Sequence, residues 1–247
     1  MAKEVMSPNL STFLVLLQYD VGILVRSWII RFWFSVTFVA GIVAIVVSSY
    51  YADDTSFLLS WALLLYAALG GFVVLVISTS AISVEFPFLG DTLISRGIAP
   101  TPYVLAKLFA RAIVIFVMFN AIVAPTAFIM QTNAINNDMT VFGITVALLY
   151  WSFMLMVLVF LGITFSVVFS NTLVGVVVLA VVWYGGMGGL IFIYAPSWDH
   201  FGVLGNLPLV LQGKALFSEI WTILGAGIVG LIALPFTAVK VFNGRDL

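Results

Sequence analysis

The longest uncharged stretch of the chain runs from Asp138 to Asp199, and it is almost wholly apolar. The 247 residues are 64% hydrophobic and 8% charged, whereas a soluble domain is about 45–50% apolar and about 25% charged. Nine Lys and Arg residues against ten Asp and Glu residues leave no basic excess for binding nucleic acid. The composition therefore predicts one all-α membrane domain over residues 1–247, with the lipid bilayer as its main solvent.

Six segments are long and apolar enough to cross about 30 Å of hydrocarbon, which takes about 20 helical residues. The predicted spans are residues 28–50, 57–79, 103–130, 141–169, 173–194 and 220–242. The long uncharged stretch needs a break, and Ser170, Asn171 and Thr172 supply a turn between the fourth and fifth spans. The sequence thus predicts a polytopic integral membrane protein with six transmembrane helices.

The N-terminal segment, residues 9–27, is apolar but is interrupted by Gln18 and Asp20. We expect a helix that lies along the membrane interface, and an extension of the first span is the alternative. Lys3 is followed by Glu4 and no small-residue cleavage pattern comes later, so we do not expect a cleaved signal peptide.

Basic residues fall on one side of the six-span topology. This side holds Lys3, Arg26, Arg31, Arg96, Lys107, Arg111, Lys240 and Arg245, and only Lys214 falls on the other. Because cations near span ends are retained in the cytoplasm, we expect a multi-pass protein of the cytoplasmic membrane with both termini inside. The four cations close to span ends are expected to snorkel to the headgroups: Arg31, Lys107, Arg111 and Lys240.

The cytoplasmic connection between the second and third spans carries most of the polar signal. Pro87 suits the first turn of a helix, and Gly97 suits the position after its end. A short helix over Phe88 to Arg96 is therefore predicted, with Asp91 near its positive end and Arg96 near its negative end. Such a helix at the membrane surface could carry force from a soluble partner, and an inert turn is the alternative.

This connection resembles the cytoplasmic segment of type 2 ABC transporter permeases. The resemblance rests on Glu85, on GDTLISRGIAPTPYVLAK from Gly90 to Lys107, and on the ending VFNGRDL from Val241. It implies a dimer of six-span subunits, identical or not, each bound to a separate ATP-binding cassette subunit that hydrolyses ATP with Mg²⁺. The short helix would then be a coupling helix, and the residues implied in ATPase coupling are Glu85, Asp91, Thr92 and Arg96.

The resemblance also implies that the second and fifth spans line a substrate path. Candidate path residues are Ser78, Thr79, Asn120, Trp183 and Tyr184. An asparagine at mid-span, such as Asn120, more often makes a hydrogen bond between helices than a contact with substrate. The apolar character of these spans favours a hydrophobic or amphipathic cargo. The glycine run of residues 184–190 suits either packing within one subunit or a dimer seam.

Several motifs that would point to other functions do not occur in the sequence. The chain has no phosphate-binding loop, so ATP hydrolysis is expected in a partner and no cofactor is expected in this chain. Cysteine is absent, and His200 is the single histidine, so an enzyme is not expected. No ionisable residue is expected near the bilayer midplane, where ion relays lie. An exporter permease is therefore predicted, with an ATP-independent channel or secondary carrier as the alternative.

Overall fold

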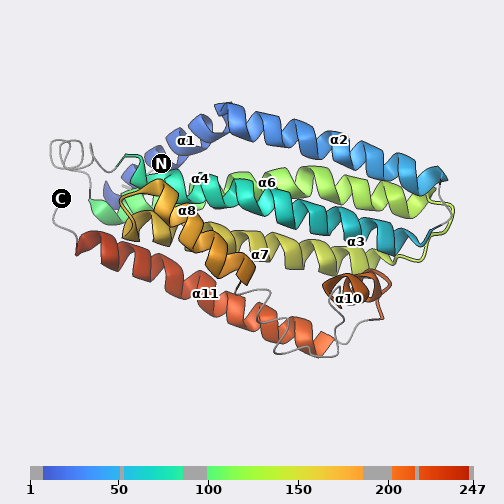
Figure 1. Ribbon diagram of the computed structural model, residues 1–247. Helices are drawn as coiled ribbons and strands as arrows, with labels where there is room; N and C mark the ends of the chain where they lie inside the picture. The colour runs from blue at the N-terminus through green and yellow to red at the C-terminus, as the bar shows by residue number, and fades with distance from the viewer. Residues whose placement is uncertain (1–7, 51–52, 86–98, 186–201, 215–216, 245–247) are drawn as a thin grey trace, which may run out of the picture.

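A computed structural model describes residues 8–50, 53–85, 99–185, 202–214 and 217–244, and every element in these ranges is helical. The long helices run side by side along one axis, and the N-terminal helix is inclined to them (Figure 1). The predicted all-α class is confirmed for the described part of the chain.

Among the residues that the structure describes, four helices are long and apolar enough to cross a membrane. They are α2 (Trp28–Tyr50), the continuous helix Thr55–Ser83, α6 (Pro100–Asn133) and α7 (Val141–Val168). The second of them is built from α3 (Thr55–Leu65), the π-helical turn η1 (Tyr66–Gly70) and α4 (Gly71–Ser83). These four helices match the first four predicted spans.

The third predicted span begins three residues too late. Helix α6 starts at Pro100, directly after the extended residue Ala99. Proline is tolerated in the first turn of a helix because the backbone N–H groups there have no intrahelical partner. Pro100 and Pro102 therefore belong to the first turn of α6, and they do not mark a loop before it.

The fifth and sixth predicted spans are described only in part. Helix α8 (Thr172–Ala180) continues into the π-helical turn η2 (Val181–Gly185), and residues 186–194 lie outside the described residues. The predicted turn before α8 is confirmed, since the Asn171 side chain accepts a hydrogen bond from the Leu173 backbone N–H at 2.9 Å. Helix α11 (Phe217–Asn243) runs along the sixth predicted span.

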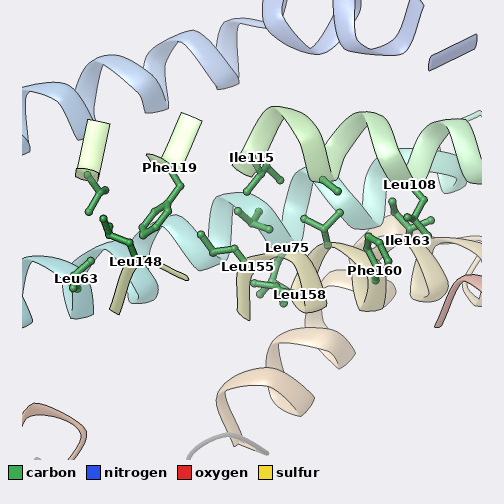
Figure 2. Packing of buried hydrophobic residues seen from close by; sticks show 14 of the residues in the cluster. Leu63, Leu75, Leu108, Ile115, Phe119, Leu148, Leu155, Leu158, Phe160 and Ile163 are labelled. Carbon is green, nitrogen blue, oxygen red and sulfur yellow. The ribbon is translucent and has the colours of Figure 1, made fainter. Parts of the chain in front are cut away.

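The core lies between the helix Thr55–Ser83, α6 and α7. Leu75, Phe119, Leu158 and Ile163 are fully buried and point into the space that these helices share (Figure 2). Helix α2 packs on α6, α8 packs on α4 and α7, and α11 packs on α7 and α6. A bundle of three central helices thus fixes the position of the outer ones.

Helix α1 (Pro8–Arg26) ends at a break at Ser27, after which α2 begins. It packs along α6, where Leu17, Val21 and Leu24 join a small apolar cluster with Ala110 and Val114. The N-terminal segment is therefore a helix of its own, and the alternative of a simple extension of the first span is wrong.

The end of the bundle where the 134–140 loop lies is called here the distal end. A short helix, α10 (Gly202–Leu211), packs against this end. The Thr140 backbone N–H donates to the Leu211 carbonyl at 2.9 Å, and Leu207 and Leu211 are buried. A Cβ at Gly143 would lie 2.2 Å from the Leu211 carbonyl oxygen, so glycine permits this approach. The two buried leucines therefore anchor α10 to the distal end of the bundle.

Large apolar side chains cover the outside of the bundle. On α2 alone, Trp28, Phe32 and Phe38 are more than half exposed. A water-soluble monomer rarely presents such a continuous apolar surface. The long apolar helices and this surface are consistent with a membrane-embedded protein.

The absence of native cysteine makes the membrane topology directly testable. Ile135 is exposed in the distal loop, whereas Asn243 lies at the other end, beside the Phe242 ring that contacts Tyr103. We expect a cysteine at Ile135 to react with an impermeant maleimide in intact cells and a cysteine at Asn243 to react only after permeabilisation. The opposite labelling pattern would reverse the predicted orientation.

Candidate functional site: a buried charged cluster

Lys107 lies about two turns into α6 and contacts two carboxylates. Its Nζ atom is 3.2 Å from Asp20 Oδ1 on α1 and 2.6 Å from Glu85 Oε1 just after α4. The Tyr103 hydroxyl donates to the other carboxylate oxygen of Glu85, and its ring lies 5.4 Å from Lys107 Nζ. One lysine therefore joins three segments that are far apart in the sequence.

Arg111 lies one turn further into the bundle, on the same face of α6. Its Nε atom donates to the Ile77 carbonyl of α4 at 3.1 Å, and an Nη atom donates to the Lys107 carbonyl at 3.2 Å. The side chain is buried, and its hydrogen bonds go to backbone oxygens rather than to a carboxylate. Arg111 thus adds a second positive charge to the cluster and ties α6 to α4.

Asp20 reaches the cluster because of the register of α1. Leu17, Val21 and Leu24 form the face that packs on α6, and residues three and four apart share a helix face. Asp20 lies on that face and is buried. An acidic residue on an apolar helix face was the signal in the sequence that could have predicted a buried ion pair.

The expected snorkelling of Lys107 and Arg111 is wrong. Both side chains are less than a tenth exposed and point between α1, α4 and α6. The carboxylates and backbone carbonyls hold the two cations inside the protein, so they do not need the headgroup region. Arg31 and Lys240 are exposed, and their snorkelling to the headgroups stays a prediction.

Of the four residues implied in ATPase coupling, the structure describes only Glu85. Glu85 is the last residue before an undescribed segment, and its side chain is 45% exposed. Asp91, Thr92 and Arg96, with the predicted helix 88–96, lie outside the described residues. The cluster therefore sits at the point where the chain enters the segment that was predicted to carry force.

Three of the candidate path residues face neighbouring helices. Ser78 and Thr79 are buried on α4, and a Cβ at Gly162 of α7 would lie only 2.3 Å from the Ser78 Cβ. Asn120 donates to the Ser152 hydroxyl of α7 at 2.8 Å, the helix-to-helix bond that was the more frequent alternative. These contacts give the three residues a packing role in the described part of the chain.

Tyr184 differs from them because its side chain is 41% exposed. Its hydroxyl donates to the Ala68 carbonyl in η1 at 2.8 Å, and thus links the π-helical turn η2 to η1. Trp183, its neighbour, is partly buried against the core. Tyr184 is the candidate path residue with the clearest access to the outside of this subunit.

A second polar cluster closes the distal end. Asp138 accepts hydrogen bonds from the Ser56 backbone N–H at 2.8 Å, from the Ser56 hydroxyl at 2.5 Å and from Gln212 Nε2 at 2.7 Å. Burial alone would raise the pKa of Asp138, but these hydrogen bonds outweigh burial and hold the pKa below its usual value. The loop, the start of α3 and the end of α10 are joined through this carboxylate.

The lowered pKa of Asp138 gives a stability effect with a defined sign. Its hydrogen bonds contribute fully above the ordinary Asp pKa of about 3.9, and the contribution is lost as pH falls through the lower folded-state pKa. We expect wild type to melt above Asp138→Asn by a constant margin at pH 5 to 8, and this margin to shrink toward pH 3. A margin that grows at low pH would contradict the assignment.

Comparison of the chain with protein-family models, curated proteins and solved structures finds no match.

Proposed function

We propose that this chain is the membrane-spanning permease subunit of an ATP-binding cassette exporter. The proposal includes six spans in each permease subunit and a second permease subunit, which is either identical or related. It also includes a separate subunit that hydrolyses ATP with Mg²⁺. Both termini would lie in the cytoplasm, and the cargo would be hydrophobic or amphipathic.

The position of the Lys107 cluster is the observation that supports this proposal best. Glu85 directly precedes the 86–98 segment, where a coupling helix is proposed, and Lys107 joins Glu85 to Asp20 on α1. Arg111 joins the same face of α6 to α4. A displacement of the 86–98 segment would therefore act directly on Glu85, which joins the end of α4 to Lys107 of α6, as a coupling contact requires.

Purification of a tagged chain from its own cells in mild detergent tests the proposal. We expect a complex of two permease subunits and two ATP-binding subunits, with masses resolved by native mass spectrometry. Arg96→Ala is expected to weaken this assembly by about 30-fold, because truncating a central interface residue costs about 2 kcal/mol or more. Lys240→Ala, which removes an exposed cation at the same end of the bundle, is the matched control.

The alternative of an ATP-independent channel or carrier is favoured by one observation. Asp20, Lys107 and Arg111 are ionisable and buried within a membrane-type bundle, where such residues often mark ion paths. A monodisperse chain without an ATPase, which passes ions in liposomes without ATP, would replace the exporter by this alternative.

A further inference from the structure

The two carboxylates on Lys107 differ in their access to water. The Asp20 side chain is 9% exposed, and the Glu85 side chain is 45% exposed. The Lys107 side chain between them is itself 8% exposed. One lysine thus has an inner and an outer counter-ion.

This difference decides which ion pair can open. A carboxylate left alone in a dry interior loses its hydration without compensation, which is strongly unfavourable. If Asp20 parted from Lys107, it would lose the ion pair that compensates most directly for its burial. Glu85 can instead exchange Lys107 for water, and Lys107 keeps Asp20 when it does so. Opening at Glu85 is therefore the less costly of the two movements.

We propose that Lys107 keeps Asp20 as a permanent counter-ion and releases Glu85 when the segment after Glu85 is displaced. The source of that displacement, an ATP-binding partner, rests on the proposed function. The order in which the two ion pairs open follows from their burial alone. Helix α1 moves with α6 in both states, and the end of α4 is the part that separates.

The charges of the cluster also favour the return of Glu85. Asp20 and Glu85 balance Lys107 and Arg111 when all four are in place. With Glu85 released, the buried part holds two cations and one carboxylate, while Arg111 keeps its backbone carbonyls and the Tyr103 hydroxyl loses its acceptor. The positive excess attracts Glu85 back, so the opening reverses once the displacement ends.

Thermal unfolding of the purified chain tests the order of the two pairs without any partner. Lys107→Met leaves Asp20 buried without its lysine, and we expect the melting temperature to fall by about 8 °C or more. Adding Asp20→Asn to Lys107→Met should recover at least half of this loss. Adding Glu85→Gln should recover little, because Glu85 can be hydrated.

The two double variants carry the same number of changes and differ only in which carboxylate is removed. Recovery by Glu85→Gln but not by Asp20→Asn would make Glu85 the permanent counter-ion and overturn the proposal. Recovery by neither substitution, or by both equally, would show that Asp20 and Glu85 do not differ as counter-ions of Lys107. This result would also overturn the proposal.

A cross-link tests the second part of the proposal in the complete complex. Phe13 of α1 and Phe109 of α6 are ring neighbours at 6.1 Å, so cysteines there can be joined by a short bis-maleimide. We expect ATP hydrolysis and transport within about two-fold of the unlinked variant. Loss of both after cross-linking would show that α1 must leave α6. If no ATP-binding partner exists, the proposed function fails, and the melting experiment still decides the ion-pair order.

Discussion

Replacing Gly162 with Ala is expected to separate α4 from α7 and to lower stability by about 2 kcal/mol or more. A Cβ at this position would lie 2.3 Å from the Ser78 Cβ and 3.4 Å from the Ser78 backbone, so no flexible side-chain end can yield. These two helices form the most extensive pairing in the bundle. The loss should appear as a fall of about 5 °C in melting temperature in detergent.

Gly230→Ala is the matched control for Gly162→Ala. Gly230 also lies in a long apolar helix, but a Cβ there would meet nothing within 4 Å. We expect no loss, and a gain of up to about 1 kcal/mol from helix propensity. The double variant Ser78→Gly with Gly162→Ala should lose less than the sum of the single variants, by about 1 kcal/mol. Strict additivity would show that the two residues do not clash.

The spans could be predicted from the sequence because they depend on composition over about 20 residues. Helix α2 has the predicted bounds, and the turn between α7 and α8 falls at Asn171, a polar residue in an apolar stretch. The π-helical turns η1 and η2 were not predicted. Trp33 and Tyr184 both contact η1, and local sequence does not encode such contacts between helices.

The charged cluster was harder to predict than the spans, although its residues show a pattern. Tyr103, Lys107 and Arg111 recur at every fourth position and so share one face of α6. Whether that face meets headgroups or protein depends on where α1 packs, and the Asp20–Lys107 contact joins residues 87 apart. The position of Lys107 near the end of a span therefore predicted snorkelling. In the structure, the packing of α1 on α6 buries Lys107 in an ion pair with Asp20.

The distal cluster illustrates the same limit. Asp54 precedes α3 but makes no side-chain cap, and the start of α3 is capped by Asp138 from a loop 82 residues later. Local rules for helix starts name the residue next to the helix. These rules do not predict a capping carboxylate that comes from a loop far away in the sequence.

Arg111→Met is expected to lower stability by about 3 kcal/mol or more. The change removes a buried cation, and it leaves Lys107 alone to balance Asp20 and Glu85. Removing one member of a buried charged network typically costs about 3–5 kcal/mol, because the remaining charge lacks compensation. The Ile77 carbonyl also loses its donor from α6. We expect a large fall in folded yield and in melting temperature.

A second substitution at Arg111 separates charge from geometry, and a substitution at Arg31 is the control. Arg111→Lys keeps the charge but cannot reproduce the guanidinium that reaches both the Ile77 and Lys107 carbonyls, so about half of the loss should remain. Arg31→Met removes an exposed arginine, and its effect should stay within about 0.5 kcal/mol. If Arg111→Met is as stable as wild type, the buried cation contributes nothing to the fold. The charged cluster would then be a local packing feature, and the coupling of α6 to α4 through Arg111 would be wrong.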